Sequence, residues 1–105
     1  MILGIATSVN DVPVRLTDER WYHIINSHPE MTSMREAVLD AVQNPDYILR
    51  SRRGAFAAVV VLGKQAWLHV FYVEKSTRDG FILSARIERQ MDKARIVWRK
   101  ENQEE

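Results

Sequence analysis

Two hydrophobic periodicities divide the chain near Pro45. Within residues 18–28, apolar side chains recur at the i, i+3, i+4, i+7 spacing of a helix, starting at Trp21. Thr17 precedes this pattern as a predicted N-cap, and acidic residues follow it where the helix dipole favours negative charge. Pro29 disfavours helical backbone at the residue before it, so the predicted helix ends near His28.

A second helical stripe covers residues 34–43. Thr32 or Ser33 can cap its N-terminus, and the Asn44-Pro45 pair closes it. The connection between the two helical patterns is short, which predicts a compact pair of helices.

After Pro45 the period changes from 3.6 to 2, and short β-favouring runs alternate with turn residues. A helical turn is predicted for residues 88–93. Pro13 disfavours a helix near the N-terminus, and we expect residues 1–13 to form an edge strand or an extended arm. The predicted strands cover residues 46–51, 55–62, 66–75, 81–87 and 94–100.

Because helices and strands are segregated along the chain, the pattern predicts an α+β fold. The expected architecture has two N-terminal helices packed on one face of a four- to five-stranded antiparallel sheet, with the other face open to a ligand. The length of 105 residues fits a single domain spanning 1–105, and residues 100–105 are predicted to be a disordered tail.

Composition excludes several classes of protein. Hydrophobic residues make up 46% and charged residues 28% of the chain, close to globular averages. The absence of cysteine excludes disulfides, a thiol nucleophile and thiolate metal sites. No apolar run is long enough for a membrane span, and the N-terminal residues lack the pattern of a signal peptide. We therefore expect a cytoplasmic protein without membrane contact.

The net charge of +1 hides an uneven distribution. Residues 1–45 carry three Lys or Arg against six acids, whereas residues 46–100 carry twelve against five, an excess of seven positive charges. The last five residues contribute three acids. A basic C-terminal half favours a polyanionic partner such as RNA, although a solvated rim of cations gives the same pattern.

Alternation along the strands predicts which side chains face the ligand. We expect the apolar set of Phe81, Leu83 and Ala85 to face the helices, which turns Ser84 and Arg86 outward. His69, as a titratable residue, is assigned to the outward face together with its alternating neighbours Trp67 and Phe71. Aromatic rings beside cations are typical of surfaces that stack bases and hold phosphates. A register shift of one residue reverses this assignment and makes the aromatics core.

The histidines favour proton transfer over metal binding. His23 and His28 are five residues apart and lie on different sides of a helix, which excludes the i, i+4 zinc pair. With three histidines and no cysteine, no metal site and no cofactor are predicted. His28 either caps helix carbonyls or acts as a general acid or base. RNA cleavage needs only such a proton carrier and cations that stabilise the phosphate, so the residue inventory suffices for it.

Several segments of the sequence resemble a small bacterial and phage group within the Barnase–EndoU–colicin–RelE superfamily of metal-independent ribonucleases. The resemblance rests on the opening "LTDERW…HI…HPEM", the "NPD" before the first predicted strand and the ending "DGF…R…W", and it covers about residues 14–98. The segments "NPD…R" and "LSAR" are also similar to BrnT toxins, RelE-like ribonucleases that a partner antitoxin holds. The resemblance implies two helices followed by an antiparallel sheet, and RNA as the substrate.

Site residues are carried over by position. The resemblance implies roles for His28, Arg50, Ser84, Arg86 and Arg89. The chain departs from the family pattern at Arg86, where many relatives have a tyrosine, and at Glu88. The assignment of the general acid and the general base therefore stays open.

These residues lead to one hypothesis with two alternatives. The hypothesis is a toxin-like endoribonuclease in which Arg50, Arg86 and Arg89 bind the phosphate, His69 or His28 moves the proton, and Ser84 orients an oxygen, with Trp67 and Phe71 binding substrate. The alternatives, both of phage or plasmid origin, are a nucleic-acid-binding module without catalysis and a protein-interaction domain whose basic face binds an acidic partner, such as a small antitoxin or immunity protein. Trp98 and a free sheet edge leave a homodimer open.

Overall fold

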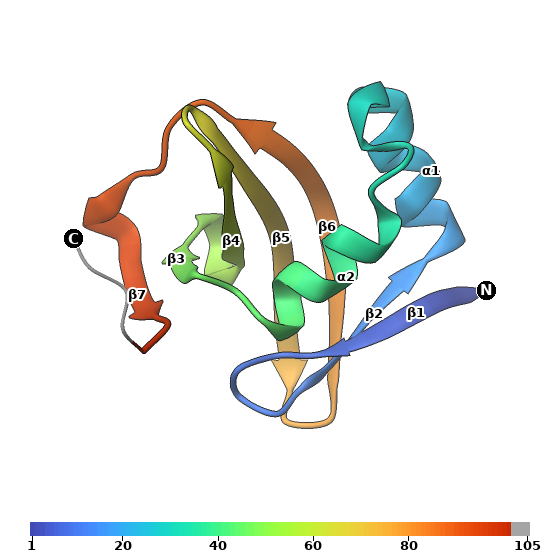
Figure 1. The fold of residues 1–105 in the computed structure, drawn as a ribbon. Helices are drawn as coiled ribbons and strands as arrows, with labels where there is room; N and C mark the ends of the chain where they lie inside the picture. The colour runs from blue at the N-terminus through green and yellow to red at the C-terminus, as the bar shows by residue number, and fades with distance from the viewer. Residues whose placement is uncertain (102–105) are drawn as a thin grey trace.

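A seven-stranded mixed sheet organises the chain, and the computed structural model describes residues 1–101 of it (Figure 1). The strand order across the sheet is β1-β2-β6-β5-β4-β3-β7. The strands are β1 (Ile2–Thr7), β2 (Pro13–Thr17), β3 (Tyr47–Arg50), β4 (Phe56–Gly63), β5 (Ala66–Ser76), β6 (Asp79–Glu88) and β7 (Ile96–Arg99). The helices are α1 (Asp18–Ser27) and α2 (Arg35–Gln43), with 3₁₀ turns η1 (Pro29–Met31), η2 (Arg52–Gly54) and η3 (Lys93–Arg95).

The α+β class is correct, but the predicted arrangement of two leading helices on a four- to five-stranded antiparallel sheet is wrong. Two strands precede the helices, and the predicted arm at residues 1–13 contains β1. β1 pairs with β2 antiparallel, and β2 then pairs with β6 in parallel, which makes the sheet mixed. Pro13 is the first residue of β2, a position where its missing N–H costs no ladder hydrogen bond.

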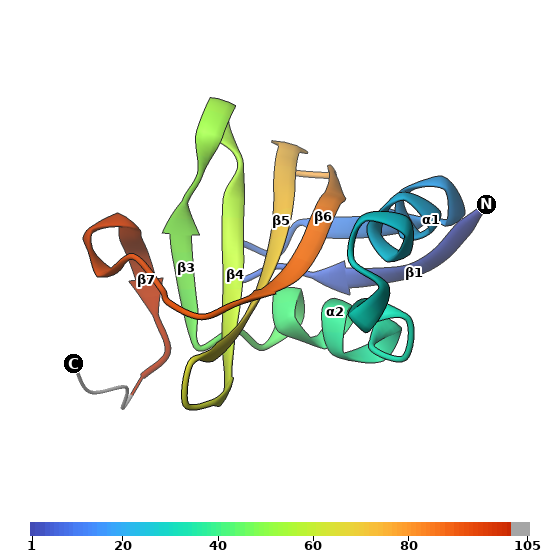
Figure 2. The ribbon, with the colours of Figure 1, turned by 90° about the horizontal axis from the view of Figure 1, so that it is seen from above.

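Both helices lie on one side of the sheet (Figure 2). α1 begins where predicted, because the Thr17 hydroxyl accepts a hydrogen bond from the Arg20 amide (3.2 Å). α2 begins later than its predicted caps. Met34 occupies its N-cap position, and the Thr32 hydroxyl instead donates to the Pro29 carbonyl (2.7 Å). Apolar residues from the helices and the sheet form the main core between the two layers.

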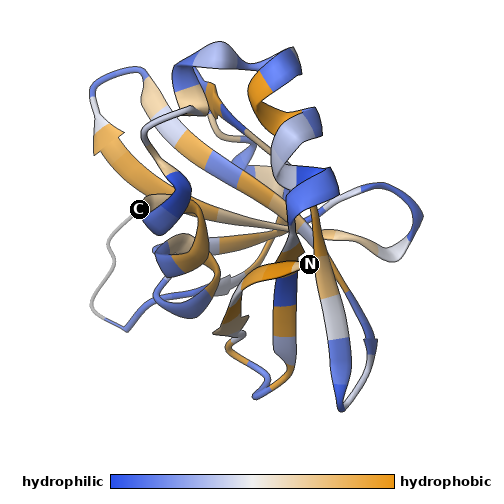
Figure 3. Ribbon diagram, turned by 90° about the vertical axis from the view of Figure 1, so that its right-hand side faces the viewer, coloured by the Kyte–Doolittle hydropathy of each residue, from blue (hydrophilic) through white to orange (hydrophobic). Residues whose placement is uncertain are grey.

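The face opposite the helices is not fully open. Tyr47, Leu49, Ala57 and Val59 form a second, smaller apolar cluster there, with Met91 and Ile96 packed against it. The chain after β6 therefore folds back over this face before β7 pairs with β3. Figure 3 shows hydrophobic and hydrophilic residues alternating along the strands. Of the tail predicted for residues 100–105, residues 102–105 lie outside the described residues.

A β-bulge in β6 corrects the predicted orientation of that strand. Phe71 pairs with Ser84 and Tyr72 pairs with Ile82, so Leu83 is an extra residue on the β6 side. Ile82 and Ala85 are both fully buried in the main core. The predicted helix-facing set of Phe81, Leu83 and Ala85 is therefore wrong for Phe81 and Leu83, because the bulge breaks strict alternation between them and Ala85.

Gly80 on β6 lies between β5 and β2, and these neighbours leave no room for a side chain there. A Cβ there would lie 2.6 Å from the Val73 carbonyl oxygen and 3.3 Å from a Val14 methyl group. We expect Gly80→Ala to lower the free energy of unfolding by about 1–3 kcal/mol, the usual cost of overpacking, as measured by urea denaturation. Gly63→Ala is the matched control, because no atom of the described residues lies within 4 Å of its Cβ position. Equal stability of the two variants would contradict the close approach of β5 and β2 to Gly80.

Candidate functional site

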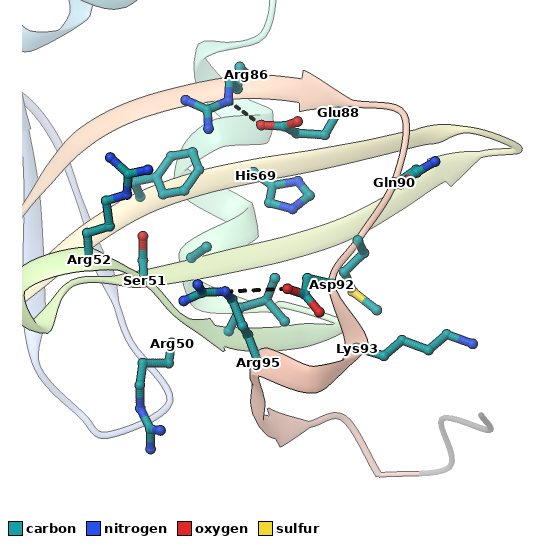
Figure 4. A pocket seen from close by; sticks show the side chains of 14 residues that line it. Arg50, Ser51, Arg52, His69, Arg86, Glu88, Gln90, Asp92, Lys93 and Arg95 are labelled. Carbon is teal, nitrogen blue, oxygen red and sulfur yellow. Dashed lines mark hydrogen bonds and ion pairs between the residues drawn. The ribbon is translucent and has the colours of Figure 1, made fainter.

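A cavity of about 590 Å³ opens on the sheet face away from the helices (Figure 4). Its lining comes from the paired strands β5 and β6, from Ala57 of β4, from the end of β3 with η2, and from the C-terminal segment that folds back over the sheet. The volume is in the range of small-ligand sites. The C-terminal segment therefore provides the wall that turns a sheet face into a cavity.

Register brings His69 and Arg86 together. The two residues are direct partners across β5 and β6, and both line the cavity. The next pairs along the same strands are Phe71 with Ser84 and Trp67 with Glu88. Since directly opposed side chains on one face are neighbours, these six residues form two adjacent columns.

The Arg86 guanidinium is held in place from two directions. Its carbon lies 4.5 Å from the centre of the Phe71 ring, a cation–π contact. Its Nε donates a hydrogen bond to Glu88 Oε2. This hydrogen bond is the main cause that keeps the pKa of Glu88 below its ordinary value, so the carboxylate stays ionised. Because Nε carries the anchoring contact, both terminal nitrogens are left to bind a ligand.

A second arginine, on the opposite wall, forms an ion pair with a carboxylate through its Nε. Arg95 Nε lies 3.4 Å from Asp92 Oδ2, and Asp92 also caps η3 by accepting from the Ala94 amide (3.1 Å). Figure 4 shows the Arg95–Asp92 and Arg86–Glu88 pairs on either side of His69. Two oriented guanidinium groups therefore flank one imidazole, an arrangement suited to bidentate contacts with phosphate oxygens.

The third wall carries Arg52. It follows β3 in η2, where Arg53 (φ 55°) and Gly54 (φ 78°) both adopt the left-handed backbone region. That conformation is uncommon for a non-glycine residue and holds the turn at the cavity rim. In Figure 4 the Arg52 and Ser51 side chains lie at the end of the cavity opposite Gln90 and Lys93, with His69 between the two ends. No ion pair of Arg52 is found among residues 1–101.

His69 has the properties of a proton acceptor. Its side chain is buried, with 6% exposed, yet it lines the cavity. The Nδ1 atom lies 3.0 Å from the Trp67 carbonyl oxygen, which can only accept, so Nδ1 carries the hydrogen. Burial is the main cause that lowers the pKa of His69 below its ordinary value, and Arg86 adds to it. At neutral pH the ring is therefore neutral, with Nε2 unprotonated.

Charge in the cavity favours an anion. Five Lys or Arg residues and two carboxylates line it, which gives an excess of three positive charges. The excess is two if Arg50 is left out because its side chain points away. Arg50 has the same strand parity as the core residue Ile48, and Figure 4 shows its side chain directed away from His69. The cationic lining comes from Arg52, Arg86, Lys93 and Arg95.

The structure brings together only part of the predicted set. His69, Phe71 and Arg86 line the cavity as neighbours. Ser84 lines an adjoining cavity instead, and Trp67 lines neither, because its ring packs against Tyr47 (6.4 Å between centres).

The remaining predicted residues lie elsewhere. Arg89 lines neither cavity. His28 occupies the C-cap of α1, with Nδ1 3.8 Å from Glu30 Oε2, although its charge contributes to the lowered pKa of Glu88. The sequence reasoning missed Glu88, Arg52 and Arg95. Continuing the alternation from Ser84 and Arg86 would have given Glu88, whereas no periodicity marks the two arginines in turns.

No group of three or more His, Asp or Glu side chains that could hold a metal ion occurs in the described part of the chain. None of the helices described is long and apolar enough to cross a membrane. No family model, curated protein or solved structure matches the chain. The superfamily resemblance therefore stays a prediction.

We expect His69 to titrate below its ordinary value of 6.5. Glu88 partly offsets the lowering, so Glu88→Gln lowers the pKa of His69 further. The measurement is an NMR titration of labelled histidine, with Glu19→Gln on α1 as the control that leaves His69 unmoved. Because the unfolded chain takes up this proton first, His69 stabilises the fold above about pH 6.5, and that contribution falls as the pH drops through the folded-state pKa. A pKa of His69 that is higher in Glu88→Gln than in wild type would contradict the position of Glu88 near His69.

Proposed function

We propose that the protein is a metal-independent, toxin-like endoribonuclease that acts in the cytoplasm. One observation carries the proposal: a neutral imidazole lines a cationic cavity between two arginines that carboxylates orient. A proton acceptor beside phosphate-binding groups is what attack of a 2′-hydroxyl on the adjacent phosphodiester requires.

The proposed reaction assigns each group a separate role. His69 Nε2 takes the proton of the 2′-hydroxyl as the bond from O2′ to phosphorus forms. Arg86 and Arg95 donate to the non-bridging oxygens, where negative charge grows in the transition state. The bond from phosphorus to O5′ then breaks, and O5′ takes a proton from water. The products are a 2′,3′-cyclic phosphate and a 5′-hydroxyl, and His69 returns its proton to solvent.

Glu88 and Asp92 orient the arginines and do not react. Each contacts the Nε of its arginine, which fixes the plane of the guanidinium. Holding two forks in place before substrate binds lowers the cost of orienting them in the transition state. This role makes Glu88 a positioning residue.

A cleavage assay with end-labelled single-stranded RNA in the presence of a chelator tests the proposal. Wild-type protein is expected to cut the RNA under these conditions. Binding without cutting favours the second candidate, a nucleic-acid-binding module, which the cationic cavity also supports. If the protein neither cuts nor binds the RNA, both the ribonuclease and the nucleic-acid-binding module are rejected. The small antitoxin partner and the homodimer stay predictions.

A further inference from the structure

A second cavity of about 690 Å³ adjoins the first. Ser51, Arg52, Phe71 and Arg86 line both, so the two form one continuous groove across the sheet face. If Arg86 binds the phosphate of a nucleotide in the first cavity, the base of that nucleotide can lie over the second cavity.

The bulge in β6 supplies one wall of this second cavity. Because Leu83 is the extra residue, Leu83 and the following Ser84 both line the cavity, although strict alternation would send them to opposite faces. Ala55, Phe71 and Val73 line it too. An apolar wall that includes an aromatic ring fits a flat, uncharged ring better than it fits a second phosphate.

The polar groups of the second cavity supply hydrogen-bond donors. Its charged residues are Arg52, Arg53 and Arg86, and no carboxylate among residues 1–101 lines it. A guanidinium only donates, whereas the hydroxyls of Ser51 and Ser84 can donate or accept. The first cavity differs, since Glu88 and Asp92 line it. The second cavity therefore favours a ligand edge that presents acceptors.

We infer that the second cavity binds the nucleobase next to the phosphate held by Arg86, and that guanine fits it best. Guanine presents two adjacent acceptors, O6 and N7, which match the fork of an arginine, whereas adenine and cytosine place an amino donor at that edge and uracil presents the single acceptor O4. The inference rests on the proposed function, because it assumes that the first cavity holds a nucleotide phosphate.

Binding of deoxynucleoside 3′,5′-bisphosphates tests the inference without cleavage, since these probes lack a 2′-hydroxyl. Calorimetry compares deoxyguanosine bisphosphate with its adenine and abasic counterparts at equal phosphate charge. We expect guanine to bind at least tenfold more tightly than the abasic probe, a difference of about 1.4 kcal/mol, and adenine to bind more weakly than guanine. Equal affinity for the guanine and abasic probes would overturn the inference.

A variant locates the preference. Leu83→Ser removes part of the apolar wall, and we expect it to lose most of the tenfold preference for guanine over the abasic probe. If Leu83→Ser fails to fold, Val73→Ser provides the same test. Val61→Ser is the matched control, because Val61 is exposed on β4 and lines neither cavity. A guanine preference that survives both Leu83→Ser and Val73→Ser would overturn the assignment of the base to the second cavity.

The two proposals can fail separately. RNA cleavage without any base preference rejects the subsite and keeps the ribonuclease. A guanine preference that depends on Leu83, found together with intact RNA in the chelator assay, supports the subsite and rejects the catalytic proposal.

Discussion

Arg86→Ala is expected to lower the rate of RNA cleavage by about 100- to 1,000-fold, the usual effect of removing one preorganised donor from a developing oxyanion. The fold should persist, because the Arg86 side chain lies on the cavity face and is 42% exposed. The substitution removes the guanidinium that stacks on Phe71 and hydrogen-bonds to Glu88. Single-turnover cleavage of labelled RNA, with circular dichroism to confirm folding, measures the effect.

Two further variants isolate the cause. Arg20→Ala removes the same residue type from the exposed side of α1 and should leave cleavage unchanged. Arg86→Lys keeps the charge and loses the fork, so we expect it to recover only part of the rate. Cleavage by Arg86→Ala at the wild-type rate would remove Arg86 from the site.

His69→Gln is expected to lower the cleavage rate by about 100- to 10,000-fold, the range for loss of a general base. RNA affinity should change little, because the neutral imidazole contributes no charge to phosphate binding. The acid side of the wild-type pH–rate profile should lie below pH 6.5, since burial lowers the pKa of this histidine and protonation abolishes the base. Rates measured from pH 4.5 to 8 check both statements.

The two candidate histidines can be compared directly. His28→Gln is expected to retain most activity, because His28 lies in the helix layer at the end of α1 and lines neither cavity. His23→Gln is the surface control on the same helix. Activity that survives His69→Gln and is lost in His28→Gln would reverse the assignment of the base.

Local chemistry explains which parts of the fold the sequence predicts. The Thr17 cap, the strands after Pro45 and the outward orientation of Phe71 follow from capping and from period-2 alternation. The pairing of β2 with β6 is a contact between segments more than 60 positions apart, and no short-range pattern encodes it. The bulge at Leu83 is equally invisible, because its sequence reads as uninterrupted strand.

The same limit applies to the site. Arg86 and His69 are predictable on one face of the sheet, because each lies on a strand whose side chains alternate and the two strands follow one another in the chain. Arg50 is a reasonable choice by position in the chain, yet strand parity turns its side chain away and Arg52 in the following turn takes its place. Arg95 reaches the cavity only because the C-terminal segment folds back, which depends on apolar contacts of Met91 and Ile96.

The chemical ends of the cleavage products test the central claim most directly. Wild-type protein should convert single-stranded RNA, in the presence of a chelator, into fragments that end in 2′,3′-cyclic phosphate. A 2′-deoxy substitution at the cleaved nucleotide should abolish that cut, and mass spectrometry distinguishes the products. RNA that stays intact with chelator, or fragments that still form at the 2′-deoxy position, would contradict the account.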